Sequence, residues 1–196
     1  MSAQAADERP VIVAFGDSLT AGYGADAGES YPDNLQRDLD KLGYAYHVEN
    51  LGVSGETTAD GLARVGAVIA RKPRIVILEF GGNDGLRGIP VTAAETNLDR
   101  TMARLTAAHI RILLAGITLP PNYGKDYISR FQGMYHDVAV KYRVPVIPFL
   151  LAGVFEHRLF QMDGIHPTAQ GYALVAETVL QYLRPMLGTP PKPKKG

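Results

Sequence analysis

The sequence predicts an α/β protein, a three-layer α/β/α sandwich built on a five-stranded parallel sheet with the strand order 2-1-3-4-5. Two observations, the alternation of elements and the length of the chain, predict one domain of this fold. Short apolar runs alternate five times with longer segments of helical spacing. Such alternation favours parallel strands joined by right-handed crossovers, with helices on both faces of the sheet. The length of 196 residues suits one domain with a buried core.

The five expected strands are short and mostly apolar, as strands buried on both faces of a sheet are. In the second, Tyr44, Tyr46 and Val48 occupy alternate positions, so they are expected to share one face. In chain order, the expected strands span residues 11–15, 44–48, 75–80, 110–117 and 144–150.

A helix is expected after each strand, because apolar residues recur there three or four positions apart. In the first helix, Leu35 and Leu39 lie on one face, and Gly43 is placed where a helix commonly stops. The third begins with the pattern of a capping box, Thr92 with Glu95 three residues later. The expected helices span residues 30–42, 58–71, 92–105, 128–142 and 168–187.

Composition excludes several classes of function. The chain has 20 Lys and Arg against 20 Asp and Glu, which gives no electrostatic basis for binding nucleic acid. It has no Cys, so disulfides, thiolate zinc sites and cysteine nucleophiles are excluded, and any nucleophile must be a hydroxyl or a carboxylate. No apolar run approaches the roughly 20 residues of a membrane span, so we expect no stable membrane insertion.

The two ends of the chain are expected to lie outside the folded domain, which should cover residues 10–187. Residues 188–196 are rich in Pro and Lys and read as a disordered tail. Residues 1–9 read as a flexible lead-in with two open explanations. Ala3-Gln4-Ala5 has the form of a signal-cleavage site, which would indicate a trimmed periplasmic or secreted protein. Alternatively, the segment is a polar lead-in, and a cytoplasmic location stays open.

Polar or glycine-rich segments follow the expected strands at the edge of the sheet where ligands of such folds bind. Ser18, in a turn after the first strand, can present its hydroxyl to solvent. Asp163 stands three residues before His166, so the carboxylate can accept from one ring nitrogen and leave the other free as a base. Each segment alone is ambiguous, because Gly-Asp-Ser is an ordinary turn sequence.

Two further segments supply hydrogen-bond donors. Gly52, after the second strand, offers an unobstructed backbone N–H, and Asn83, after the third, places a carboxamide at the mouth of the sheet. Asn in a Gly-rich turn often only tolerates a left-handed conformation. The four segments together nevertheless supply a nucleophile, a base, a residue that orients the base, and oxyanion donors, which indicates a serine hydrolase.

In these segments the sequence resembles the SGNH (GDSL) hydrolase superfamily. The resemblance covers about residues 10–187 in the same order and spacing, through Gly16-Asp17-Ser18-Leu19, the Gly52 turn, Gly81-Gly82-Asn83-Asp84 and Asp163-x-x-His166. Residues 81–88 (GGNDGLRG) and 121–124 (PNYG) look like the bacterial branch of acyl-CoA thioesterases, lysophospholipases and arylesterases.

The resemblance implies a role for each of these residues. Ser18 would be the nucleophile, His166 the general base and then acid, and Asp163 the carboxylate that orients it. The backbone N–H groups of Ser18 and Gly52 and the side-chain amide of Asn83 would form the oxyanion hole. The reaction would be acyl transfer to water through an acyl-enzyme, with no metal and no cofactor.

The expected substrates are small esters and thioesters with short to medium acyl chains, including lysophospholipids and aryl esters. The loop at residues 85–90 follows Asn83 directly, and we expect Leu86, Ile89 and Tyr123 to contact the acyl chain. The connections between elements are short and leave no lid, which favours an open site. The protein is expected to be a monomer or a weak oligomer.

Two other classes remain open at this point. A carbohydrate O-acetyl esterase of the same superfamily would carry the same catalytic residues and differ only on the leaving-group side of the pocket. A non-enzymatic flavodoxin-like binding module would share the sheet and could use Asp17 as a phosphoacceptor. Such a module needs further acidic residues at the end of the first strand, whereas Asp7 and Glu8 precede that strand.

Overall fold

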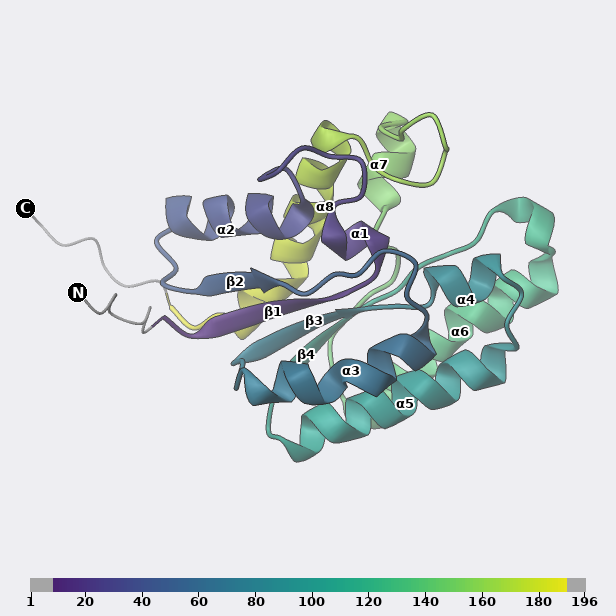
Figure 1. Cartoon of the computed structure of the whole chain (residues 1–196), viewed down its shortest axis with the longest axis horizontal. Coiled ribbons are helices and arrows are strands. Elements are labelled where there is room, and N and C mark those ends of the chain that lie inside the picture. The colour runs from purple at the N-terminus through teal and green to yellow at the C-terminus, as the bar shows by residue number, and fades with distance from the viewer. Residues whose placement is uncertain (1–8, 190–196) are drawn as a thin grey trace, which may run out of the picture.

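The computed structural model describes residues 9–189. Its centre is a five-stranded parallel sheet in the order β2-β1-β3-β4-β5 (Figure 1), which confirms the strand order predicted from the sequence. The strands are β1 (Val11–Gly16), β2 (His47–Asn50), β3 (Ile75–Glu79), β4 (Arg111–Ala115) and β5 (Val146–Ile147).

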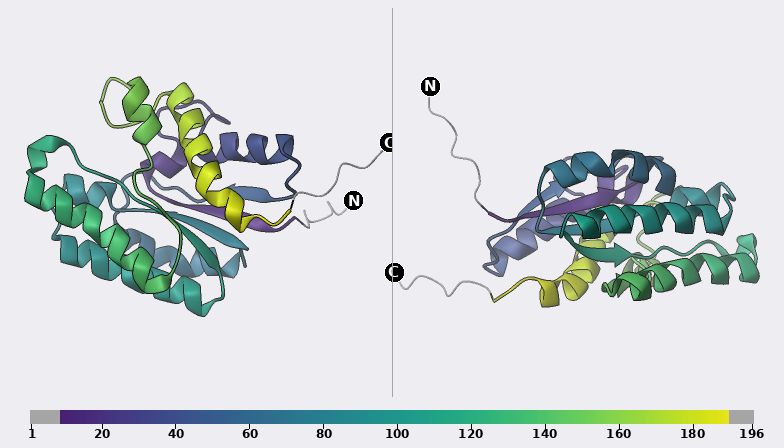
Figure 2. Two further views of the ribbon diagram at one scale, coloured as in Figure 1. Left: turned by 180° about the vertical axis from the view of Figure 1, so that it is seen from behind. Right: turned by 90° about the horizontal axis from the view of Figure 1, so that it is seen from below.

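Helices cover both faces of the sheet, as a three-layer sandwich requires. The long helices are α2 (Tyr31–Lys41), α3 (Thr58–Ala70), α5 (Val91–Ala107), α6 (Lys125–Tyr142) and α8 (Ala169–Leu183). Helices α2 and α8 pack together on one face, above the sheet in Figure 1, whereas α3 and α5 pack together on the other. Helix α6 lies beside α5 and contacts β4 and β5 (Figure 2).

The core is formed by the two central strands and the inward faces of these helices. Every residue of β3 is buried, and so are all residues of β1 after Val11. The register pairs Gly16 of β1 with Glu79 of β3, the last residue of each strand. The turns that follow these two strands therefore begin side by side.

Three short helices follow β1, β3 and β5 at the carboxyl edge of the sheet and were not expected from the sequence. They are α1 (Ser18–Ala21), α4 (Gly82–Leu86) and α7 (Ala152–His157). With only 4, 5 and 6 residues, they are too short for a repeating apolar pattern to identify them. They matter because they carry side chains into the region where the chemistry was predicted.

The capping box expected at Thr92 is wrong. Helix α5 begins one residue earlier, its N-cap is Pro90, and no side chain caps it. Reciprocal side-chain caps occur before two other helices, where Asp rather than Glu occupies the third position and the Glu/Gln rule does not apply. These caps are Ser30 with Asp33 before α2, and Thr57 with Asp60 before α3.

Two edge strands are shorter than expected. β5 has two residues, because Pro145 and Pro148 flank it and proline has no N–H to donate to the ladder. β2 begins at His47 because Tyr44 still belongs to the turn that closes α2, where its N–H donates to the carbonyl of Leu39.

The last helix also ends earlier than expected. α8 stops at Leu183, and a 3₁₀ turn, η2 (Arg184–Met186), follows because Pro185 cannot continue an α-helix. Apart from residues 9, 188 and 189, the expected lead-in (1–9) and tail (188–196) lie outside the described residues. No helix in residues 9–189 combines the length and the apolar character needed to cross a membrane.

Candidate active site

The candidate site lies at the carboxyl edge of the sheet, where β1 gives way to α1. Asp17 caps α1 by accepting a hydrogen bond from the backbone N–H of Leu19, 3.0 Å away. This turn makes Ser18 the first residue of the helix and leaves it half-buried at the surface of a cavity. The serine hydroxyl is therefore positioned by a largely buried strand, a capped turn and a short helix.

The structure brings the three residues of the predicted triad together. The Oγ of Ser18 lies 2.9 Å from Nε2 of His166, and the Nδ1 of His166 lies 2.6 Å from Oδ2 of Asp163. The other oxygen of Asp163 accepts the backbone N–H groups of Ile165 and His166, at 2.9 and 3.0 Å. The loop thus holds its own carboxylate in place, and the carboxylate orients the imidazole.

The electrostatics of Asp163 suit this arrangement. Partial burial raises the pKa of its carboxyl, but the hydrogen bonds from the ring of His166 and from two backbone N–H groups outweigh burial and lower the pKa to about 2. Asp163 is therefore ionised at neutral pH. An ionised carboxylate at Nδ1 favours the tautomer with a proton there, which leaves Nε2 free to accept the proton of Ser18.

An aromatic ring that the sequence did not single out packs against the histidine. The ring of Tyr23 lies 4.5 Å from the ring of His166, between centroids, at an angle of 40°. The backbone carbonyl of Tyr23 accepts hydrogen bonds from Nε2 of Gln161 and from the hydroxyl of Tyr172, at 2.8 and 3.0 Å. Its position near the nucleophile in the sequence was the available signal, but a loop tyrosine has many possible orientations.

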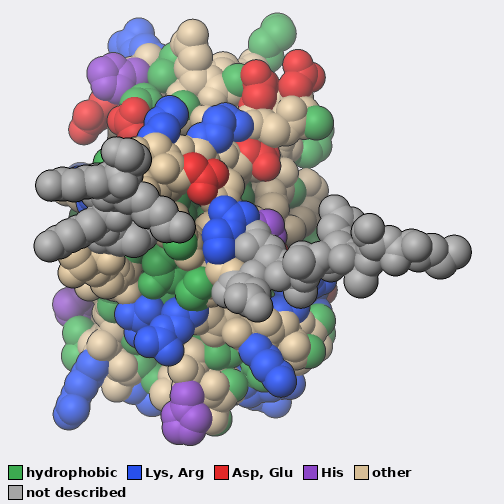
Figure 3. Space-filling view, turned by 90° about the vertical axis from the view of Figure 1, so that its left-hand side faces the viewer, with side chains coloured by type: hydrophobic (Ala, Val, Ile, Leu, Met, Phe, Trp, Pro, Cys, Tyr) green, Lys and Arg blue, Asp and Glu red, His purple; other side chains and the backbone are tan. Residues whose placement is uncertain are grey.

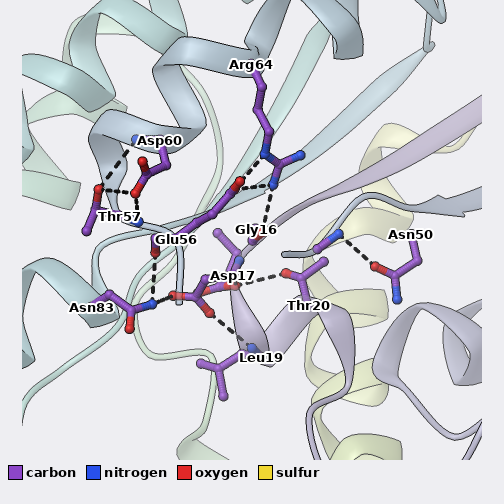
Figure 4. Close-up of polar contacts among 12 residues, drawn as sticks. Gly16, Asp17, Leu19, Thr20, Asn50, Glu56, Thr57, Asp60, Arg64 and Asn83 are labelled. Atoms are coloured by element: carbon purple, nitrogen blue, oxygen red, sulfur yellow. Dashed lines mark hydrogen bonds and ion pairs between the residues drawn. The ribbon is translucent and has the colours of Figure 1, made fainter. Parts of the chain in front are cut away.

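The predicted oxyanion donors differ in whether they already have hydrogen-bond acceptors within the protein. The N–H of Ser18, the first residue of α1, has no acceptor within the helix. The Nδ2 of Asn83, in the first turn of α4, donates to Oδ2 of Asp17 at 3.0 Å and to the carbonyl of Glu56 at 2.9 Å (Figure 4). Both hydrogens of the amide are therefore engaged within the protein in this structure.

Gly52 does not lie where the sequence analysis expected it. Its N–H donates to Oδ1 of Asn50 at 2.9 Å, and it is not among the residues that line the cavity. A Cβ there would come within 2.2 Å of the backbone nitrogen of Ala21, so this glycine allows the loop to pack against α1. Gly55, three residues later with a φ of +84°, lines the cavity instead.

The N–H of Gly55 has no acceptor among residues 9–189, and the residue lines the cavity. Sequence reasoning could not separate it from Gly52, because both stand in the same loop and both lack a side chain. The difference depends on which glycine the turn presents to the cavity.

The cavity has a volume of about 690 Å³ and lies beside Ser18, within the size range of small-molecule sites. Of the three residues expected to contact an acyl chain, Leu86 lines it and Ile89 and Tyr123 do not. Tyr123 supports the wall from behind, since its hydroxyl donates to the carbonyl of Leu86 at 2.9 Å. Eight other apolar residues of the wall were not predicted as substrate contacts: Leu19, Ile117, Leu119, Phe149, Leu151, Phe155, Phe160 and Ile165.

No group of three or more His, Asp or Glu side chains that could hold a metal ion occurs in the part of the chain that the structure describes.

The known proteins that this chain resembles are named as ester and thioester hydrolases. Residues 14–174 match the family model described as GDSL-like lipase/acylhydrolase. The esterase TesA of Pseudomonas aeruginosa is 40% identical over 189 residues, which cover 95% of this chain and 93% of the relative. The thioesterase 1/protease 1/lysophospholipase L1 of Escherichia coli K12 is 36% identical over 178 residues, or 90% of this chain and 84% of the relative.

Solved structures of esterases also superpose on this chain. The crystal structure of TesA superposes with a TM-score of 0.87 at 40% identity, covering 90% of this chain and 99% of that one. The psychrotrophic esterase EstA of Pseudoalteromonas, in a structure inhibited by monoethylphosphonate, superposes with a TM-score of 0.85 at 29% identity, covering 91% and 99%.

Proposed function

The chain belongs to the GDSL-like lipase/acylhydrolase family and is a serine hydrolase of carboxylic esters and thioesters, and we propose that Ser18, His166 and Asp163 form its catalytic triad. The observation that carries the assignment of residues is the continuous line of contacts from Oγ of Ser18, through the ring of His166, to Asp163. A serine hydroxyl is a weak nucleophile until a base accepts its proton, and His166 is placed to do so.

In the first half of the reaction, His166 takes the proton of Ser18 while Oγ bonds to the acyl carbon. The tetrahedral intermediate collapses as His166 returns the proton to the leaving alcohol or thiol, and the acyl group stays on Ser18. Water then enters, gives its proton to His166 and attacks the acyl-enzyme. Collapse of the second intermediate releases the carboxylic acid and restores Ser18.

We assign the oxyanion hole to the N–H groups of Ser18 and Gly55 and to the amide of Asn83, with Gly55 in place of Gly52. Asn83 can donate to an oxyanion only by sharing or exchanging one of its two hydrogen bonds. Its bond to the carboxyl of Asp17 is stronger when that group is charged, whereas its bond to the Glu56 carbonyl is neutral. The hydrogen that points at Glu56 is therefore the one that turns to the oxyanion.

Covalent labelling tests the triad directly. An organophosphonate should add one phosphonyl group to the parent protein, located on Ser18 by peptide mass spectrometry. Ser18→Ala should take up no label and should lose on the order of 10⁴-fold or more in kcat. Unlabelled parent protein, or label on another residue, would remove Ser18 from the mechanism.

The cavity supports an acyl group as the part of the substrate that it holds. Its walls are mainly apolar, and its volume of about 690 Å³ exceeds what an acetyl group needs. We propose that it takes short to medium acyl chains, from lysophospholipids and aryl esters as well as thioesters. Profiling p-nitrophenyl esters by chain length beside acyl-CoAs tests this.

The apolar walls argue against one alternative function, and the burial of Asp17 argues against the other. A carbohydrate O-acetyl esterase holds a small acyl group and a polar leaving group, which matches this lining poorly. A phosphoacceptor role for Asp17 needs an accessible carboxylate, whereas Asp17 is only 2% exposed and already accepts hydrogen bonds from Leu19 and Asn83.

We further propose that the protein acts in the periplasm or outside the cell, as a monomer or weak oligomer without a nucleic-acid partner. The form of Ala3-Gln4-Ala5 supports the location. The balanced charge of the chain supports the absence of nucleic acid. On the face seen in Figure 3, Lys and Arg side chains lie over the whole height of the view, and acidic ones lie among them in the upper half. Cell fractionation and light scattering test these points.

A further inference from the structure

Glu79 is a fully buried carboxyl beneath the nucleophile turn, and the reaction as described does not use it. Its Oε2 accepts hydrogen bonds from the backbone N–H of Asp17 at 3.2 Å and from the hydroxyl of Thr20 at 2.9 Å. Its Oε1 has no hydrogen-bond partner within the described residues. Gly16 makes room for this carboxyl, because a Cβ there would lie 2.4 Å from Oε2.

Asp17 is a second buried carboxyl, and its hydrogen bonds differ in kind. Its Oδ1 accepts the N–H of Leu19, and its Oδ2 accepts the Nδ2 of Asn83, each at 3.0 Å (Figure 4). An ionised carboxylate accepts these two bonds more strongly than a protonated acid does, so the pattern favours the charged form of Asp17.

Two adjacent buried carboxyls cannot both be ionised at low cost, and the hydrogen bonds indicate which one is neutral. Oε2 of Glu79 accepts both of its bonds, as the carbonyl oxygen of a neutral acid does, and Oε1 is free to carry the proton. Burial raises the pKa of Glu79 well above its ordinary value, and the charge of Asp17 raises it further. Burial also raises the pKa of Asp17, but only to about 6, because its hydrogen bonds oppose the effect.

Charged neighbours do not change which of the two carboxyls, Asp17 or Glu79, is ionised. No Lys or Arg among residues 9–189 forms an ion pair with either carboxyl, and Arg64 is paired with Glu56. The titratable groups that face the two carboxyls from the surrounding elements are Tyr31 of α2, Tyr135 of α6, Tyr172 of α8 and His166 of the catalytic loop. Burial raises the pKa of all three tyrosines, so they remain neutral at neutral pH.

We propose that Glu79 is a positioning residue for ester hydrolysis: held neutral, it holds Asp17 in place through the backbone N–H of that residue and leaves Asp17 as the single anion that orients the amide of Asn83. This inference rests on the proposed role of Asn83 in the oxyanion hole. Asp17 anchors one hydrogen of the amide, and the other hydrogen, which donates to the carbonyl of Glu56, is the one to be shared with the oxyanion. Glu79 acts on the reaction only through Asp17 and Asn83.

A double-mutant cycle tests whether Glu79 acts through Asn83. The substrate is one activated ester, p-nitrophenyl butyrate. Glu79→Leu should lower kcat by about 10-fold with little change in KM, because the oxyanion donor acts mainly in the transition state. Glu79→Gln, a neutral isostere, should restore most of the loss. In an Asn83→Ala background, Glu79→Leu should cost less than about twofold, since its effect passes through the missing amide.

Each contrary result of the cycle would contradict a different part of the proposal. An equal loss with and without Asn83 would show that Glu79 acts elsewhere, and a Gln variant as poor as the Leu variant would show that the charge of Glu79 is required. If Asn83→Ala alone keeps full kcat, both the oxyanion assignment and this inference fail, whereas labelling of Ser18 would still stand.

Infrared spectroscopy provides a measurement that does not depend on the Leu variant folding. The parent protein at pH 7 should show the carbonyl band of a protonated carboxyl group, and Glu79→Gln should lack it. The matched control, Glu177→Gln on the exposed face of α8, should keep it. Absence of the band from the parent, or its persistence in Glu79→Gln, would overturn the proposal.

Discussion

The ring of Tyr23 packs against the ring of His166, the proposed catalytic base, with centroids 4.5 Å apart. The contact limits rotation of an imidazole whose side chain is 16% exposed. It also places an aromatic face beside the ring that takes up positive charge in the proposed proton transfer from Ser18. Tyr23 thus complements Asp163, which holds the same ring from its Nδ1 side.

We therefore expect Tyr23→Ala to lower kcat by about 5- to 10-fold, because the imidazole loses a neighbour that restrains it and stabilises its charged form. Tyr23→Phe keeps the ring and should stay within about twofold of the parent. Steady-state kinetics on one p-nitrophenyl ester decides this. Equal losses in the two variants would assign the effect to the tyrosine hydroxyl instead.

The part of the site that could be predicted from the sequence is the part fixed by topology and by short spacing. Parallel strands end at one edge of the sheet, so Ser18 and Asn83 had to approach each other. Asp163 and His166 are three residues apart, so one loop suffices to bring them into contact. Neither inference requires knowledge of how side chains pack.

The features that could not be predicted depend on tertiary contacts. Gly52 and Gly55 look alike in the sequence, and only the packing of their loop against α1 shows which one faces the cavity. Glu79 reads as the polar end of an apolar strand, and its burial becomes evident only when β1 pairs beside it. The wall residue Phe155 belongs to α7, a helix too short to be recognised from periodicity.

The cavity wall predicts how chain-length preference can be changed. Phe155 is 68% exposed, and its ring packs edge-on against Phe160 with centroids 6.3 Å apart. A longer acyl chain would bury the ring of Phe155, whereas an acetyl group would not reach it. Phe155→Ala should lower kcat/KM for an octanoyl ester by about 10-fold, about 1.4 kcal/mol of apolar burial, and leave an acetyl ester within about twofold.

The neighbouring exposed residue provides the control. Glu156→Ala, on the same helix, should leave the ratio of octanoyl to acetyl kcat/KM unchanged. If Phe155→Ala also leaves that ratio unchanged, the acyl chain lies along another wall of the cavity.

The pH dependence of activity should report Asp17 as well as the histidine. His166 must be neutral to accept a proton, and Asp17 must be ionised to anchor Asn83. Because burial raises the pKa of Asp17 to about 6, acidification through that range protonates its carboxyl. We expect log kcat/KM of the parent to fall more steeply below about pH 6 than that of Asp17→Asn, which has no carboxyl to titrate, by a slope difference of about 1. The activity of Asp17→Asn should be lower at every pH. Equal slopes in the two proteins would contradict titration of Asp17 in this range.

Stability should depend on pH through Glu79. Burial raises its pKa well above 4.5 in the folded protein, so from about pH 5 upward the folded state holds a proton that the unfolded chain has released. The state that binds more protons is weakened as pH rises, by up to about 1.4 kcal/mol per pH unit for one group. Glu79→Gln removes this proton, so its free energy of unfolding should fall less steeply with pH than that of the parent. Urea unfolding at pH 5, 6 and 7 measures both slopes, and parallel slopes would count against a neutral Glu79.

Substitutions of Asn83 distinguish two roles for this residue, that of an oxyanion donor and that of a residue that only shapes a turn. If its amide donates to the oxyanion, Asn83→Ala should lower kcat by about 10²- to 10³-fold with little change in KM, because the bond strengthens in the transition state. Asn83→Asp should be at least as harmful, since a carboxylate would repel both the oxyanion and Asp17, which lies 3.0 Å from the present amide nitrogen.

The glycine variant at the same position distinguishes the two explanations. If Asn83 served only the local backbone, Asn83→Gly would be nearly silent, because Gly adopts any turn conformation without strain. The structure argues against that explanation, since Asn83 lies inside α4 and the positive φ of this segment, +123°, belongs to Gly81. We therefore expect Gly and Ala to be equally poor when kcat is measured on the same ester. A fully active Asn83→Gly enzyme would refute the oxyanion assignment, and with it the reason for Asp17 and Glu79 to be buried beneath the nucleophile.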